Sequence, residues 1–274
     1  MTLCIAAACE EDKKQFIVMC SDTKVETAIA GAEIEDKVRW VLPGWPALLA
    51  GNVTKAEGLI DLYSNTLRPK KLTVKNIISQ FKGPAQLFKK QLADEYTHQT
   101  VAMSYQRFLK AGKRLLPERQ FDRMLEEIEH HTYGQLEPQR CSVLFCGFLA
   151  NEPYIFEVTS EGTATYVEHF AVIGSGADVA LPALFQRKYS YDTPLQQALY
   201  YVYEAKKLGE IVPGVGKDTR IDILESDASG RTREDAKSVN EKGLVLLEEQ
   251  YQKYGLKPVP EAIGLEKALH FDAL

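Results

Sequence analysis

Runs of small and β-branched apolar residues open the chain, and neighbouring positions in them are apolar together rather than alternately. This pattern is typical of strands that are covered on both faces. The first two runs, TLCIAAAC and QFIVMCS, lie on either side of the polar segment EEDKK and predict a β-hairpin. The next two, VRWVL and ALLAG, enclose PGWP, whose Pro and Gly residues predict a second hairpin.

The second half of the chain repeats the apolar runs. CSVLFCGFL and PYIFEVTS predict two strands joined by a turn around Asn151-Glu152. TATYVEHFAVIG predicts a further pair of strands, and TRIDIL predicts a last one. Strands therefore come in two groups, separated by a long segment with a different period.

Apolar residues at helical spacing predict the remaining elements. A helix over about 52–65 would begin at Asn52 or Thr54 and turn four side chains inward, namely Ala56, Leu59, Ile60 and Leu62. Residues 73–131 keep a helical period throughout. Breaks in that period are expected at two places, near Gly83-Pro84 and around Pro117.

Later helices are expected at about 176–188, 193–210 and 241–254, the second begun by Asp192 or Thr193 with Pro194 in its first position. The order of elements is thus strands, helices, strands, helices and a strand. Antiparallel strands that are apolar on both faces need cover on both, and two packed sheets with helices outside provide it. The fold class expected is α/β (α+β), as a four-layer αββα sandwich.

Length and composition fit one soluble globular domain over residues 1–274, with a helical insertion at about 66–135 and a C-terminal helical tail at 235–274. The apolar runs are too short to span a bilayer, and no basic leader precedes the first strand. We therefore expect a cytoplasmic protein without membrane contact. Five cysteines lack metal-ligand spacing and predict reduced, buried thiols: Cys4, Cys9, Cys20, Cys141 and Cys146.

Charge is unevenly distributed along the chain. Residues 66–114 carry eleven Lys or Arg against Asp94 and Glu95, a net +9, so the rest carries −14 of the total −5. Nucleic-acid binding would need aromatic residues interleaved with these charges. The aromatic residues fall instead at helical intervals beside other apolar residues, which favours a solvated helix face or a subunit contact: Phe81, Phe88, Tyr96, Tyr105 and Phe108.

A threonine stands directly behind Met1, at the mouth of the first strand. If the first turn is centred on Asp12, Thr2 lies opposite Asp22 in the antiparallel ladder. If the second is centred near Gly44, Lys37 lies opposite Gly51. A one-residue change in either turn moves these pairs. Both arrangements place polar groups at strand ends, where they can be presented to a substrate.

This set of groups has a coherent chemistry. Removal of Met1 would free the α-amine of Thr2, and α-amines titrate near pH 7.7–8.0, as suits a general base. Base and hydroxyl nucleophile would then share one residue. The Lys37 ammonium would stabilise a developing alkoxide, Asp22 would keep Lys37 charged and aimed, and the Gly51 N–H could donate to an oxyanion. Taken singly, each residue also has a structural explanation. Thr2 could occupy its position by chance and Asp22 could simply end a strand. Lys37 could be a solvated charge, and Gly51 could be a hinge between a strand and a helix.

With these residues the sequence resembles the N-terminal-nucleophile (Ntn) hydrolases of the proteasome type, over residues 2–64 and 141–225. CSDTK, with Asp22 and Lys24, is similar to the family's "DxR" element. Lys37 precedes Gly51 of LLAGN by fourteen residues, like the family lysine before its "AGG" turn. AVIGSGADVALPALF matches the glycine-serine-glycine turn and supplies Ser175, and KKLGEIV offers Glu210 where the family has Asp.

The sequence also departs from the family pattern. The first hairpin is longer, Lys24 replaces arginine, Asn52 replaces the second glycine of the turn, and Glu210 is one methylene longer than Asp. IVPGVGKDT does not align cleanly, so the family's late serine has no counterpart. The helical insertion is foreign to standard β subunits.

The resemblance implies a threonine-type peptidase without metal or organic cofactor, acting on peptides or unfolded proteins. It implies six catalytic residues: Thr2, Asp22, Lys37, Gly51, Ser175 and Glu210. It also suggests a homo-oligomer, as a ring or helical array, with an ATPase unfoldase as a candidate partner and no nucleic acid. Two alternatives stay open: an Ntn amidase of the same fold acting on a small amide, and an inactive scaffold subunit that keeps Met1.

Overall fold

The computed structural model describes residues 2–26, 31–33, 37–42, 44–68, 71–132, 140–233 and 236–255. Two five-stranded antiparallel sheets form its centre. The first has the order β10-β1-β2-β11-β12, made of Phe170–Ile173, Cys4–Glu11, Lys14–Asp22, Thr219–Glu225 and Lys237–Ser238. The second has the order β5-β6-β7-β8-β9, made of Val38–Leu42, Trp45–Gly51, Cys141–Leu149, Glu152–Thr159 and Ala164–Val167.

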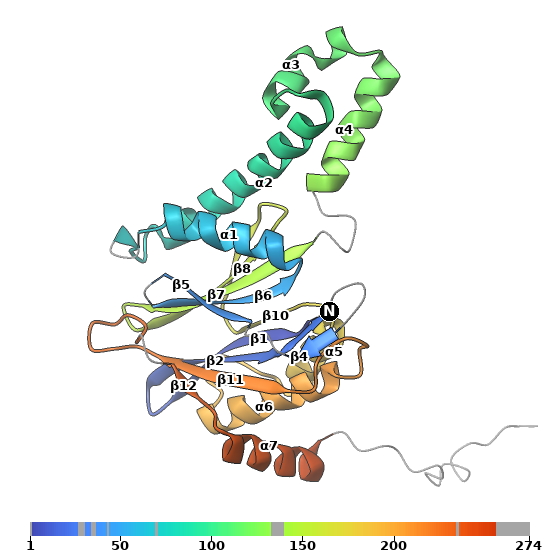
Figure 1. The fold of residues 1–274 in the computed structure, drawn as a ribbon. Coiled ribbons are helices and arrows are strands. Elements are labelled where there is room, and N and C mark those ends of the chain that lie inside the picture. Colours follow the sequence, from blue (N-terminus) through green and yellow to red (C-terminus); the bar gives the residue numbers. More distant parts are fainter. Residues whose placement is uncertain are drawn as a thin grey trace, which may run out of the picture.

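Helices cover the outer face of each sheet (Figure 1). The second sheet is covered by α1 (Val53–Thr66) and the first part of α2 (Ile77–Val101). The first sheet is covered by α5 (Ala177–Gln186) and α6 (Leu195–Gly209), with α7 (Glu241–Tyr254) outside α6. A small two-stranded sheet, which the sequence pattern did not predict, joins β3 (Lys24–Glu26) to β4 (Gly31–Glu33).

Three apolar layers hold the four structural layers together. Along β1, Ile5 and Ala7 face the helices, whereas Cys4 and Ala6 face the second sheet. The consecutive apolar residues of the first strand are therefore explained by burial on both faces. The predicted four-layer αββα sandwich is confirmed. All five cysteines are buried and free, and burial raises the pKa of the Cys9 and Cys20 thiols to about 12.

Both predicted hairpins form, but each predicted register is wrong. The first turn contains two residues with positive φ, Asp12 and Lys13, as a tight two-residue hairpin turn prefers. The register Cys4↔Ser21 follows, so Leu3 and not Thr2 lies beside Asp22. In the second hairpin, Val38 pairs with Leu48. The Lys37 carbonyl therefore accepts a hydrogen bond from the Leu49 N–H, and Lys37 does not lie opposite Gly51.

The two strands predicted in TATYVEHFAVIG both form, but they do not pair with each other. They are β9 and β10, of which β9 pairs with β8 in the second sheet and β10 pairs with β1 in the first. The chain crosses between the sheets at Glu168 and His169. Apolar periodicity predicts a strand but does not specify its partner, which explains the error.

The helix predictions are confirmed apart from details, one of which is that Pro194 is the N-cap of α6 and not its first residue. Asn52 caps α1 through a hydrogen bond from the Lys55 N–H. Leu62 is partly buried against the core, while Tyr63, which was not predicted, is fully buried beside it. The break predicted near Gly83-Pro84 is wrong, because α2 continues through Pro84. Burial of this part of α2 against the second sheet outweighs the hydrogen bond that a helical proline removes. The helix ends instead at Ala102, whose φ is 56°.

The distal half of α2 forms an arm with α3 (Tyr105–Leu115) and α4 (Glu118–Thr132) that extends away from the sandwich (Figure 1). Between α3 and α4 the chain turns at Pro117, as predicted. The arm has an apolar core of its own, in which the rings of Phe108 and Phe121 stack at 4.9 Å. Residues 69–70 and 133–135 of the predicted insertion, and 235 and 256–274 of the predicted tail, lie outside the described residues.

Candidate active site

The beginning of β1 is fixed in the core rather than frayed. Leu3 is fully buried and packs beneath the helices of the first sheet. Two glycines leave room for its side chain, since a Cβ at Gly209 would lie 2.4 Å from Leu3 Cδ2 and one at Gly176 would lie 3.2 Å from Leu3 Cβ. Thr2, the next residue toward the N-terminus, is therefore held in a defined position and is only 8% exposed.

The Thr2 hydroxyl contacts a buried ion pair. Lys37 Nζ donates to Thr2 Oγ1 at 2.8 Å and to Asp22 Oδ1 at 2.6 Å. Asp22 is fully buried and Lys37 is 7% exposed. Thr2 and Asp22 belong to the first sheet, whereas Lys37 immediately precedes β5 of the second. The three groups thus meet between the two sheets, at the ends of their strands.

Two backbone amides and one ammonium fix the Asp22 carboxylate. Oδ1 accepts from the Leu3 N–H at 2.9 Å as well as from Lys37, and Oδ2 accepts from the Gly216 N–H at 2.9 Å. Donors on both oxygens restrict rotation of the carboxylate and compensate for its burial. Asp22 can therefore hold the Lys37 ammonium in one position against Thr2 Oγ1.

The predicted glycine-serine-glycine turn wraps the backbone of Thr2. Ser175 Oγ lies 3.2 Å from Thr2 N and 3.4 Å from Thr2 O, and the Gly176 N–H donates to Thr2 O at 3.3 Å. Gly174 has a φ of 99°, and a Cβ there would lie 2.1 Å from Thr2 O. This turn therefore requires glycine, and it brings a hydroxyl to the nitrogen that removal of Met1 would convert to an amine.

Two of the six predicted residues make their recorded contacts elsewhere. Gly51 ends β6 opposite Cys141, with a φ of 87°, and a Cβ there would lie 2.2 Å from the Arg140 carbonyl oxygen. This steric requirement explains why residue 51 is a glycine, and it concerns the side-chain position rather than the predicted role of the backbone N–H. Glu210 follows α6 and pairs with Lys206 at 2.5 Å and Lys207 at 3.0 Å. Among the described residues, no hydrogen bond joins Gly51 or Glu210 to Thr2.

Sequence reasoning did not connect three groups with the site. Gly216 lies in IVPGVGKDT, which has neither periodicity nor a clean alignment. Cys4 is buried between the sheets close to Lys37, and its burial raises the pKa of its thiol. Lys206 is fully buried although charged, and it follows Ala198 and Val202 at four-residue intervals on the buried face of α6. That spacing was a signal in the sequence.

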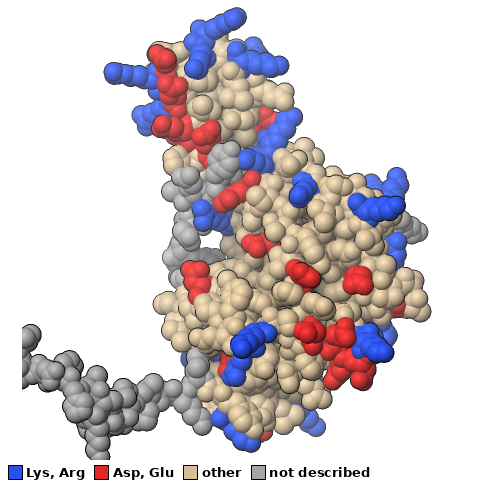
Figure 2. Space-filling view, turned by 180° about the vertical axis from the view of Figure 1, so that it is seen from behind, with Lys and Arg blue, Asp and Glu red and all other residues tan. Residues whose placement is uncertain are grey.

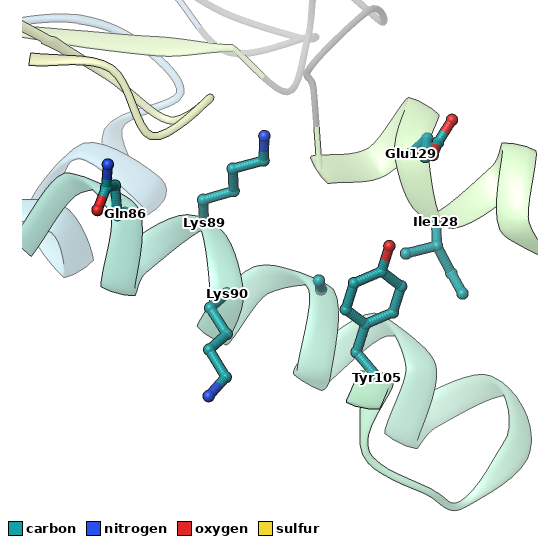
Figure 3. A pocket seen from close by; sticks show the side chains of 7 residues that line it. Gln86, Lys89, Lys90, Tyr105, Ile128 and Glu129 are labelled. Atoms are coloured by element: carbon teal, nitrogen blue, oxygen red, sulfur yellow. The ribbon is translucent and has the colours of Figure 1, made fainter. Parts of the chain in front are cut away.

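A separate hollow lies in the arm, away from Thr2. Lys89 and Lys90 of α2 lie at its side, and Tyr105 of α3 faces Ile128 of α4 across it (Figure 3). Within the described ranges, no three His, Cys, Asp or Glu side chains are grouped so that they could hold a metal ion. No described helix is both long and apolar enough to cross a membrane.

Comparison with known proteins agrees with this architecture. A family model for proteasome subunits matches residues 99–209. The structure of Anbu (ancestral beta-subunit) from Yersinia bercovieri is similar over 92% of this chain and 94% of that one, with a TM-score of 0.58 and 16% identity. The chain has a proteasome-like fold. An Anbu (Gly-1) mutant from Hyphomicrobium sp. strain MC1 gives the same coverage and TM-score at 17% identity.

The proteasome-like fold is thus shown by structure more than by sequence. No curated protein sequence matches the chain. The residues matched by the family model include Ser175 but not Thr2, Asp22 or Lys37. Any role of those three residues must therefore be argued from their geometry in this chain.

Proposed function

We propose that this protein is an N-terminal threonine hydrolase that cleaves peptide bonds. The observation that carries the proposal is the buried hydrogen bond from Lys37 Nζ to Thr2 Oγ1, with Asp22 behind the lysine. Burying two charges costs several kcal/mol per ion, and replacing a buried ion pair by apolar residues of similar volume is often neutral or stabilising. The Lys37 ammonium would stabilise Thr2 Oγ1 once that oxygen becomes negatively charged during the reaction, which gives the buried pair a functional reason.

The proposed reaction has two steps. After removal of Met1, the Thr2 α-amine takes the proton of Oγ1, directly or through a water, while Oγ1 attacks the carbonyl carbon of the substrate. The C–N bond then breaks, and the leaving amine takes that proton from the α-ammonium, which leaves an ester on Thr2. A water activated by the same amine hydrolyses the ester, releases the acid and restores the hydroxyl.

Each remaining residue has a proposed part in this reaction. Lys37 stabilises the negative charge on Oγ1 as the bond forms. Ser175 orients the α-amine, since its hydroxyl lies 3.2 Å from that nitrogen. Gly51 is the proposed N–H donor to the oxyanion. Glu210 is proposed to help orient the α-amine through hydrogen bonds around it. The last two assignments depend on the resemblance alone.

Intact mass and substrate class together test the proposal. We expect the purified chain to lack Met1 and to release the fluorophore from peptide amides in preference to small amides. A processed chain that cleaves only small amides would replace the peptidase with an amidase. A chain that keeps Met1 and turns over neither substrate would contradict the proposal and favour a scaffold subunit.

Self-association is the second part of the proposal, because the proteasome-like fold and the uneven charge both suggest it. The arm presents exposed Lys and Arg side chains together with some acidic ones, and the sandwich shows a cluster of acidic residues among scattered basic ones (Figure 2). The charges are not separated completely: α4 carries five acidic and two basic residues, a net −3. Since α4 packs against α2, part of the basic charge is offset within the subunit.

Sedimentation tests the assembly. We expect a homo-oligomer at micromolar concentration whose dissociation increases with salt, because exposed ion pairs are screened within about 8–10 Å near 0.1 M ionic strength. The effect should be modest, since such pairs contribute about 0–1 kcal/mol each. A single species near 30.8 kDa at low salt would reject the assembly. An oligomer indifferent to salt would reject its electrostatic origin.

A further inference from the structure

We propose that Lys206 is a positioning residue for the reaction: it holds the 210–218 loop so that the Gly216 N–H fixes the Asp22 carboxylate. This inference rests on the proposed function, since positioning matters for catalysis only if Thr2 is the nucleophile. Lys206 touches neither Thr2 nor Lys37 among its recorded contacts, and it acts through the loop.

The Lys206 ammonium is fully buried, and two oxygens of the same loop bind it. Nζ donates to Glu210 Oε1 at 2.5 Å and to the Lys217 carbonyl at 2.6 Å. Glu210 is the first residue of the loop and Lys217 is near its end, so one ammonium ties both ends to α6. Without these hydrogen bonds the start of the loop keeps the Lys207–Glu210 ion pair and its middle keeps the apolar packing of Val212 and Val215, but the Lys217 carbonyl next to Gly216 loses the donor that ties it to α6.

Gly216 immediately precedes Lys217, and its N–H donates to Asp22 Oδ2 at 2.9 Å. The position of this donor therefore depends on the carbonyl that Lys206 holds. Asp22 Oδ1 takes the Leu3 N–H and Lys37, so Gly216 is the recorded partner of the other oxygen. If the donor moves, the carboxylate can rotate, and Oδ1 no longer holds Lys37 in line with Thr2 Oγ1.

A purely structural role explains Lys206 poorly. A fully buried ammonium loses its hydration, and a methionine of similar volume would fill the same space without that cost. The stability of α6 also has another source, because Arg187 binds Glu204 on this helix through two hydrogen bonds of 2.6 and 2.7 Å. The ion pair at Lys206 differs in that it reaches the loop beside Asp22.

The test compares Lys206→Met with a matched control, Glu204→Gln. Both residues lie on α6, are at most 2% exposed and take part in ion pairs, but Glu204 has no recorded contact with the loop. We expect Lys206→Met to lower kcat by about 10–100-fold with KM within about twofold, as small misplacements of catalytic groups do. The Gly216 amide should also exchange hydrogen at least about tenfold faster than in the wild type, as local opening predicts. Glu204→Gln should change none of these quantities by more than about twofold.

Lys206→Met should fold, because Lys207 remains 3.0 Å from Glu210 and keeps that carboxylate paired. Lys206→Gln, which keeps a donor for the Lys217 carbonyl, is measured alongside and decides the matter if the methionine variant does not fold. It should show the same two changes at smaller size. An unchanged Gly216 exchange rate, or faster exchange with unchanged kcat, would overturn the proposal. If the wild type hydrolyses nothing, the proposed function fails, whereas the exchange measurement still reports whether Lys206 holds Gly216.

Discussion

Replacing Thr2 by alanine should lower kcat for peptide hydrolysis by about 10⁴-fold or more, as loss of a catalytic nucleophile does in other hydrolases. The variant loses Oγ1, the atom that Lys37 contacts at 2.8 Å, but keeps the α-amine and its contact with Ser175. Its melting temperature should change little, because the change removes only a small part of a side chain, Leu3 still packs in the core, and Lys37 keeps its ion pair with Asp22. Turnover of a fluorogenic peptide and a thermal melt measure the two quantities.

Thr2→Ser is the matched control, since it keeps the hydroxyl and loses only a methyl group. It should retain activity within about 10–100-fold of the wild type if Oγ is the nucleophile, because nucleophilic catalysis of this kind needs only a correctly placed hydroxyl and its base. Intact mass must show that Met1 is absent from all three proteins, so that each presents a free amine. Wild-type turnover by processed Thr2→Ala would eliminate Thr2 as the nucleophile.

Replacing Lys37 by methionine should reduce both activity and stability. Activity should fall by about 10²–10³-fold, the range seen when a group that stabilises transition-state charge is removed. Stability should fall by about 3–5 kcal/mol, because Asp22 is left as a fully buried charge without its cation. Denaturant unfolding gives the free energy, and kcat is measured at a temperature where the variant is folded.

A second variant separates these two effects. Asp22→Asn/Lys37→Met removes both charges and should recover most of the lost free energy of unfolding, since paired removal of a buried ion pair is often neutral. It should not recover kcat. If the double variant regains activity together with stability, Lys37 supports the fold and has no part in the chemistry.

The sequence contained enough information for the layers of this fold but not for its pairings. A strand with apolar residues on both faces, such as Ile5 on one and Ala6 on the other, must be covered on both faces whichever strands it pairs with. The predicted registers were wrong because each depends on the exact centre of a turn. The first turn is centred between Asp12 and Lys13 and not on Asp12. The predicted pairing of β9 with β10 was wrong because adjacency along the chain does not determine which sheet a strand joins.

Errors in the predicted strand registers affected the predicted site contacts less than they affected the predicted strand pairings. Lys37 reaches Thr2 and Asp22 although its backbone lies beside Leu49, because a long side chain can span a shift along the strand. Ser175 was predicted through the resemblance to the family's glycine-serine-glycine turn, and the structure explains the first glycine of that turn by its positive φ and its contact with Thr2. Gly216 was not, because a backbone N–H leaves no trace in the identity of its residue, and its loop has no period to place it.

The site can form only late during synthesis of the chain. β1 pairs with its neighbour β2 in a local hairpin, but it also pairs with β10, as Cys4 does with Ile173, and β2 pairs with β11, as Asp22 does with Thr219. Contacts between residues so distant in sequence close slowly and require both segments to be present. Ser175 and Gly216 therefore reach Thr2 and Asp22 only after most of the polypeptide has been made. The order of folding thus delays assembly of the candidate site until most of the chain has been made.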